Sequence, residues 1–105
     1  MEVVDGDASL LRDIVAEGLK EMPDLLSNLR GALGQDNATD ARRAAHTLKA
    51  AGRTLGIAKL LDMAQQVEEA GAQTNLPRVR ELLPELEGIV LSVCDALQHW
   101  LKEQP

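Results

Sequence analysis

Residues 76–103 read LPRVRELLPELEGIVLSVCDALQHWLKE, and this stretch has the clearest helical pattern in the chain. Its apolar side chains recur at alternating steps of three and four residues, at Leu76, Val79, Leu83, Leu86, Val90, Val93, Leu97 and Trp100. This spacing places them on one face of an α-helix, as in the packed seam of a helical bundle. Pro77 suits the first turn, whereas Pro84 lies inside the pattern and removes the backbone hydrogen bond to the carbonyl of Arg80. We expect a long bundle helix over 76–103, with a kink or a boundary at Pro84.

The chain before this segment contains further apolar stripes with helical spacing, separated by short turn sequences. They predict helices over about 8–20, 22–33, 38–55 and 57–72. Pro23 marks a break or bend between the first two, and Gly34 ends the second. Gly56 and Gly71 end the third and fourth.

The composition agrees with an all-α protein. Leu and Ala dominate the apolar residues, and Trp100 is the single aromatic residue, with no Phe or Tyr, so the core must be aliphatic. At 105 residues the chain is long enough for one core and one domain, over residues 1–105. Short turns between amphipathic helices predict an antiparallel four-helix bundle with up-down topology. Residues 8–20 would form an additional N-terminal helix across one end.

Charge and cysteine content exclude several classes of function. The net charge of −6 and the lack of aromatic stacking platforms argue against a nucleic-acid partner. The single cysteine, Cys94, forms no internal disulfide and supplies no metal cluster, which suits a reducing compartment. No apolar run is long enough for membrane insertion, and the first residues are acidic where a secretion signal is basic. We therefore expect a cytoplasmic protein.

The predicted helix over 38–55 has two faces of different character. Asp36, Asn37 or Thr39 can cap its start. At about 100° per residue, one face carries the small and apolar residues Ala41, Ala44, Ala45, Leu48, Ala51, Gly52 and Leu55. The other face has His46 at its centre, with Thr39, Arg42, Arg43, Lys49, Ala50 and Arg53 beside or above it. Four cations around one imidazole are suited to handling an anion such as phosphate.

This segment resembles the histidine-containing phosphotransfer (Hpt) domain of bacterial phosphorelays. The family pattern is matched by an alanine-flanked His46 followed by Leu48, Lys49, Ala51 and Gly56. Residues 60–64 and 67–71 are similar to the helix that follows in the family, so that the resemblance covers roughly residues 20–104. Ala50 stands where the family usually has glycine, a position that lets a partner approach the histidine closely.

The resemblance implies a role for each residue of the His46 face. His46 would be the phosphoacceptor, and Lys49, one turn along, would bond a phosphoryl oxygen. Arg42, Arg43 and Arg53, together with Ala50, would lie under a docked partner. That partner would be the receiver domain of a response regulator. The chain would receive its phosphoryl group from a receiver aspartate of a hybrid sensor histidine kinase. The chain would need no cofactor of its own, because the receiver brings both the aspartate and the Mg²⁺.

Other interpretations of the same residues remain. The chain has no Gly-rich phosphate loop, which argues against an ATP-dependent kinase and favours a phosphocarrier without enzyme activity of its own. A helical adaptor that binds a signalling partner, with an incidental histidine, is the alternative function. Metal binding at His46 is disfavoured, because no carboxylate or second histidine lies three or four residues away along the helix. His99 and the pair Glu68 and Glu69 are expected to be surface residues.

Overall fold

The computed structural model describes the backbone of residues 2–104 and the side chains of residues 9–104. The described backbone is helical, without strands. It forms four helices: α1 (Glu2–Gly34), α2 (Ala38–Leu55), α3 (Ala58–Ala72) and α4 (Leu76–Glu103). At about 1.5 Å per residue, α1 and α4 are much longer than the two helices between them.

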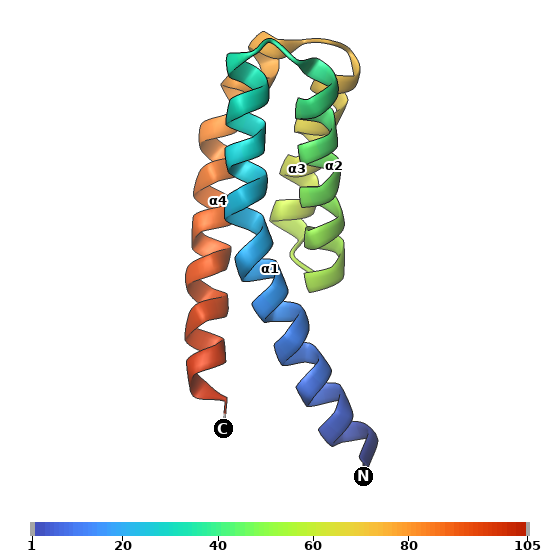
Figure 1. Ribbon diagram of the computed structural model, residues 1–105, viewed down its shortest axis with the longest axis vertical. Helices are drawn as coiled ribbons and strands as arrows, with labels where there is room; N and C mark the ends of the chain where they lie inside the picture. The colour runs from blue at the N-terminus through green and yellow to red at the C-terminus, as the bar shows by residue number, and fades with distance from the viewer. Residues whose placement is uncertain (1, 105) are drawn as a thin grey trace.

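The four helices pack side by side as a bundle. Each helix contacts its neighbours in chain order, and α1 also contacts α4, so the contacts close into a ring. Figure 1 shows that α1 and α4 extend beyond α2 and α3 at the lower end, where both termini lie. The bundle is therefore elongated, at 50 × 21 × 20 Å.

Turns of a few residues join the helices, and a side chain or a glycine caps several of the helix ends. The Asn37 side chain caps α2 by accepting a hydrogen bond from the backbone N–H of Asp40 at 3.1 Å. Gly56 ends α2 in the left-handed conformation at φ 70°, where a residue with a Cβ is strained. Asn75 caps α4 in the same way, through the N–H of Arg78. These short connections force consecutive helices to run antiparallel.

Aliphatic side chains from all four helices fill the core. The largest that are almost completely buried are Met22, Leu29, Leu48, Leu60, Val67, Val79, Leu86 and Val90. Most of the apolar seam predicted on α4 is buried, and Leu82, outside that seam, is buried too. No polar or charged residue is buried among the described side chains. Any polar chemistry of this protein must therefore take place on its surface.

The prediction of two helices before residue 34 is wrong. One helix, α1, runs through Pro23, so the described residues contain no separate helix packed across one end of the bundle. The buried side chains of α1 explain this result, because Val15, Met22, Leu26, Leu29 and Leu33 keep a single stripe on both sides of the proline. Their burial outweighs the one backbone hydrogen bond that a proline removes.

Two other residues that were expected to interrupt or end a helix lie inside one, although α3 ends at Ala72, the end of its predicted range. α4 is continuous through Pro84, and α3 continues past Gly71 to Ala72. Gly71 serves instead as a point of contact between helices, because its backbone lies against Arg42 of α2. None of the four helices between residues 2 and 104 combines the length and the apolar character needed to cross a membrane.

Candidate functional site

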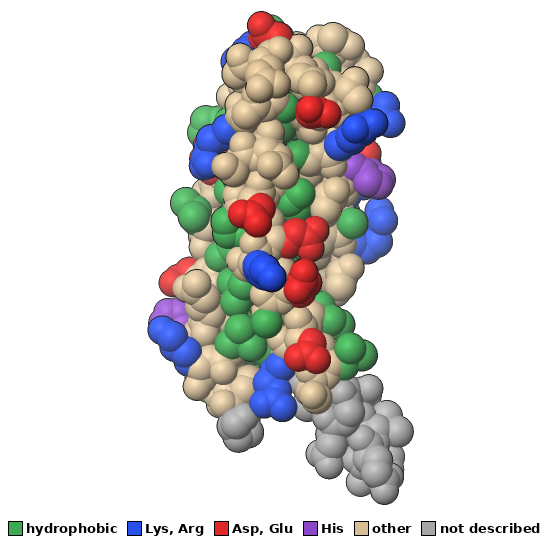
Figure 2. All heavy atoms as spheres, in the orientation of Figure 1, with side chains coloured by type: hydrophobic (Ala, Val, Ile, Leu, Met, Phe, Trp, Pro, Cys, Tyr) green, Lys and Arg blue, Asp and Glu red, His purple; other side chains and the backbone are tan. Residues whose placement is uncertain are grey.

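The two faces of α2 have the orientation that the helical angles predict. Ala41, Ala44, Ala45, Leu48 and Gly52 are buried against the other helices. Arg42, Arg43, His46, Ala50 and Arg53 are exposed. Figure 2 shows two separate histidine side chains, and the one on the α2 side of the bundle has Lys or Arg side chains above and below it. The packing of the small residues thus fixes which way the basic face points.

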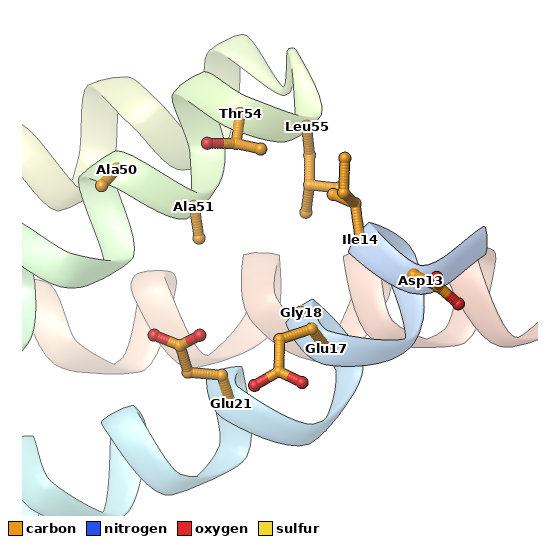
Figure 3. Close-up of a pocket in the computed structure, with 9 residues that line it drawn as sticks. All are labelled: Asp13, Ile14, Glu17, Gly18, Glu21, Ala50, Ala51, Thr54 and Leu55. Carbon is orange, nitrogen blue, oxygen red and sulfur yellow. The ribbon is translucent and has the colours of Figure 1, made fainter. Parts of the chain in front are cut away.

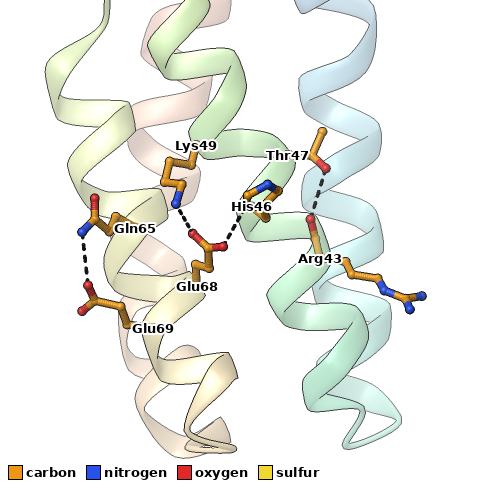
Figure 4. A network of polar contacts seen from close by, with 7 residues as sticks. All are labelled: Arg43, His46, Thr47, Lys49, Gln65, Glu68 and Glu69. Atoms are coloured by element: carbon orange, nitrogen blue, oxygen red, sulfur yellow. Dashed lines mark hydrogen bonds and ion pairs between the residues drawn. The ribbon is translucent and has the colours of Figure 1, made fainter.

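His46 is held by a carboxylate from the neighbouring helix. Its Nδ1 lies 2.6 Å from Oε2 of Glu68 on α3, while 63% of the imidazole side chain remains exposed (Figure 4). A carboxylate only accepts hydrogen bonds, so the ring tautomer that fits this contact carries its proton on Nδ1. Nε2 is then left with its lone pair, away from Glu68. This is the arrangement that a nucleophilic histidine needs.

The same carboxylate also binds Lys49. The Nζ of Lys49 lies 2.5 Å from the other oxygen of Glu68, and only 17% of the lysine side chain is exposed. The sequence predicts Lys49 beside His46 on an exposed face, and the structure corrects this, because the ammonium is turned toward α3 and is mostly covered. One turn of α2 therefore brings an imidazole and an ammonium to a single carboxylate (Figure 4).

Glu68 remains a carboxylate in this setting. Burial alone would raise its pKa, but hydrogen bonds from Lys49 and His46 and the positive charge of Lys49 outweigh it, and the pKa is held below its usual value. The ionised form can therefore accept from both neighbours and offset positive charge on either of them.

The three arginines of the predicted site surround His46 without contacting it. Arg43 lies 3.9 Å from Asp40 with 78% of its side chain exposed, and Arg42 and Arg53 are also exposed. Within the described residues, no hydrogen bond or ion pair joins these arginines to His46 or Glu68. Their exposed guanidinium groups therefore do not organise the imidazole.

Ala50, one turn beyond His46, lies beside a groove between α1 and α2. The groove has a volume of about 480 Å³ and includes Ala51, Thr54 and Leu55 of α2 in its lining. Figure 3 shows Ala51 pointing into the gap, and Ile14 of α1 meeting Leu55 at one end. Ala50 also lines this groove, and its methyl group protrudes little from the helix surface between the groove and His46.

Glu68 is the site residue that sequence reasoning missed, because it was assigned to a solvated face together with Glu69. The signal that could have found it is the register of the α2–α3 hairpin. Gly56 fixes the turn, and in an antiparallel pair, residues equally far from the turn face each other. Ten residues before Gly56 is His46, and ten residues after it is Gln66, within one helical turn of Glu68.

The remaining candidate groups lie elsewhere. His99 is exposed on α4, where its Nε2 lies 3.8 Å from Oδ1 of Asp95. Its partner in this contact differs from that of His46, which is Glu68. Among residues 9–104, no three side chains of His, Cys, Asp or Glu lie close enough together to hold a metal ion. Glu68 and Lys49 are therefore the described residues that share a network of polar contacts with His46.

Comparison with known protein families matches residues 13–103 to the Hpt domain, which is nearly the whole chain. The chain belongs to this family of histidine-containing phosphotransfer domains. Searches of curated proteins and of solved structures found no significant match. The resemblance inferred from the His46 segment is thereby confirmed, and the family connects the chain to histidine phosphotransfer in two-component phosphorelays.

Proposed function

We propose that the chain relays a phosphoryl group between receiver-domain aspartates, with Nε2 of His46 as the acceptor atom. The observation that carries this proposal is the hydrogen bond between Nδ1 of His46 and the carboxylate of Glu68. The rest of the imidazole ring is exposed. It presents the unprotonated Nε2 to solvent on a helix surface that a partner can cover. The family assignment supports the same chemistry.

The transfer step balances without an added acid or base. Nε2 attacks the phosphorus of an aspartyl phosphate, the N–P bond forms, the P–O bond to the aspartate breaks, and the aspartate leaves as a carboxylate. The proton on Nδ1 stays in place, so the phosphorylated ring is cationic, and the negative charge of Glu68 offsets it. The reverse sequence passes the phosphoryl group to the next aspartate.

Lys49 would stabilise the phosphorylated state. Its ammonium is held by Glu68 one turn from His46, and rotation about its side-chain bonds would carry Nζ to a phosphoryl oxygen. Glu68 contacts both His46 and Lys49, which ties this ammonium to the acceptor ring. The Mg²⁺ expected in such a transfer would be held by the receiver domain.

The partner would be an acidic receiver domain of a response regulator or of a hybrid sensor kinase, in the cytoplasm. Arg42, Arg43 and Arg53 are exposed around His46 and would attract the acidic pocket that carries the aspartate. Ala50 would lie under the docked partner. The chain would act as a phosphocarrier and leave the use of ATP to the kinase.

The experiment that tests this function follows phosphate from a receiver to the chain. The receiver domains of the source organism are phosphorylated with acetyl phosphate and incubated with the chain. We expect acid-labile, base-stable phosphate to appear on wild type and on His99→Gln, and to be absent from His46→Gln with helical content unchanged by circular dichroism. Labelling that survives in His46→Gln and is lost in His99→Gln would overturn the assignment.

A further inference from the structure

Two glycines lie where the backbones of α2 and α3 come close together. A Cβ placed on Gly52 of α2 would lie 2.8 Å from the backbone nitrogen of Leu61, and one placed on Gly71 of α3 would lie 3.1 Å from the Cα of Arg42. In both places the nearest atom belongs to backbone, which cannot turn aside as the end of a flexible side chain can. The spacing of the two helices therefore depends on these missing methyl groups.

The pair His46 and Glu68 lies between these two contacts, nearer to the one at Gly71. Arg42 is one turn before His46 on α2, and Gly71 is about one turn after Glu68 on α3. If α2 moves away from α3 at the contact between Arg42 and Gly71, only one turn of each helix separates that contact from the imidazole and the carboxylate. Gly52 is almost two turns from His46.

We propose that Gly71 is a positioning residue: by letting α3 lie against the backbone of Arg42, it sets the distance at which Glu68 holds Nδ1 of His46 and Nζ of Lys49. The consequence for phosphotransfer rests on the proposed function, whereas the effect on the imidazole does not.

The imidazole is sensitive to this distance because it has an alternative partner. With 63% of its side chain exposed, His46 can exchange the carboxylate for water whenever the contact at 2.6 Å lengthens. The ring is then free to carry its proton on Nε2, and in that tautomer Nε2 has no lone pair with which to attack phosphorus. A shift of a few tenths of an ångström in the helix spacing thus changes the fraction of chains with a nucleophilic Nε2.

Gly71→Ala tests the proposal, and Gly88→Ala is the matched control. Both glycines lie inside helices, but a Cβ on Gly88 would meet nothing within 4 Å. The ring nitrogens of His46 are observed by ¹⁵N NMR in histidine-labelled protein, with His99→Gln to assign the signals. We expect Gly71→Ala to move the His46 signals toward the Nε2–H tautomer and Gly88→Ala to leave them at the wild-type positions.

A kinetic cycle then asks whether Gly71 acts through Glu68. Phosphoramidate, a small phosphodonor, labels histidine without a protein partner, and we expect Gly71→Ala to slow this labelling about threefold to tenfold. In a Glu68→Ala background the same change should have no further effect. Unchanged ring nitrogens in folded Gly71→Ala, or equal slowing with and without Glu68, would overturn the proposal.

Two outcomes are kept separate by these readouts. If Gly71→Ala melts below the working temperature, the substitution is made again in a chain that also carries Gly88→Ala. Alanine has a higher helix propensity than glycine, so this background is more stable. If the tautomer shifts as expected but neither phosphoramidate nor any receiver labels His46, the positioning role stands and the proposed function fails.

Discussion

Glu68 organises the site around His46, although in the proposed function it would not be the reacting group. Its carboxylate accepts from an imidazole through one oxygen and from an ammonium through the other, with 18% of its own side chain exposed. Each donor would be less ordered without it, since His46 would turn in solvent and Lys49 would leave the helix surface. A charged acceptor between two donors is also stronger than a neutral one.

The pH dependence of stability gives a test of this pairing. The pKa of Glu68 is lower in the folded chain than its usual value, so its contribution to stability is present above the unfolded pKa and is lost as the pH falls through the folded pKa. We expect the free energy of unfolding of wild type, from urea titrations, to fall more steeply below about pH 5 than that of Glu68→Gln. Glu85→Gln, an exposed carboxylate on α4, should keep the wild-type dependence. Identical curves for wild type and Glu68→Gln would contradict the pairing.

The positions of His46 and the arginines could be predicted from the sequence because they depend on the geometry of one helix. A repeat of 3.6 residues fixes the angle between any two side chains on α2, whatever surrounds it. The positions of Glu68 and the Lys49 ammonium depend on a second helix and on its register. A helical angle places Lys49 beside His46, but it does not say that a carboxylate from α3 will draw the ammonium to itself.

At the scale of the elements, α1 shows how packing overrides a local signal. Taken alone, Pro23 predicts a break or bend, because proline lacks the N–H that bonds the carbonyl four residues back. The apolar stripe, which continues through the proline, was the more reliable signal: Met22, Leu25 and Leu26 are all buried around it, whereas Pro23 itself is exposed. Where a stripe keeps its phase across a proline, one helix is the better prediction.

Replacing this proline should stabilise the protein. Pro23→Ala restores the missing hydrogen bond inside α1 without changing a buried side chain, so we expect the free energy of unfolding to rise by up to about 3 kcal/mol. Pro77→Ala is the control, because Pro77 lies in the first turn of α4, where no hydrogen bond is lost. A Pro23→Ala variant no more stable than Pro77→Ala would show that α1 has already adapted to its proline.

At the scale of the whole molecule, the bundle presents the α2 surface and leaves α4 on another side. α4 packs on α1 and α3, so a partner covering His46 has no need to contact it. The exposed arginines and the low surface at Ala50 lie together on α2, while the net charge of the chain is −6. A partner guided by charge is therefore directed to one face.

Docking on this face can be tested by enlarging one exposed alanine. Ala50→Leu should slow transfer from a phosphorylated receiver while leaving phosphoramidate labelling and stability near wild type, because the added atoms lie under the partner. Ala96→Leu, at an exposed alanine of α4, should change neither rate. Equal receiver kinetics for Ala50→Leu and wild type would favour an adaptor that binds elsewhere.

The arginines should act on the same encounter at longer range. Neutralising Arg42, Arg43 and Arg53 to Gln should lower the association rate with the receiver, most strongly at low ionic strength, because salt screens exposed charges. Stopped-flow measurements at two salt concentrations separate this effect from a change in dissociation. A rate that is unchanged at low salt would exclude steering by these three side chains.

The exposure of His46 on the outer face of a helix has a consequence for signalling kinetics. A single exposed histidine can be covered by one receiver domain at a time. The phosphodonor and the phosphoacceptor would therefore have to bind in succession, as the substrates of a ping-pong reaction do. An unphosphorylated donor that lingers on α2 then competes with the acceptor that waits for the phosphate. Flux through such a carrier would rise with partner concentration, pass a maximum and decline, which makes the abundance of the two partners a control on the pathway.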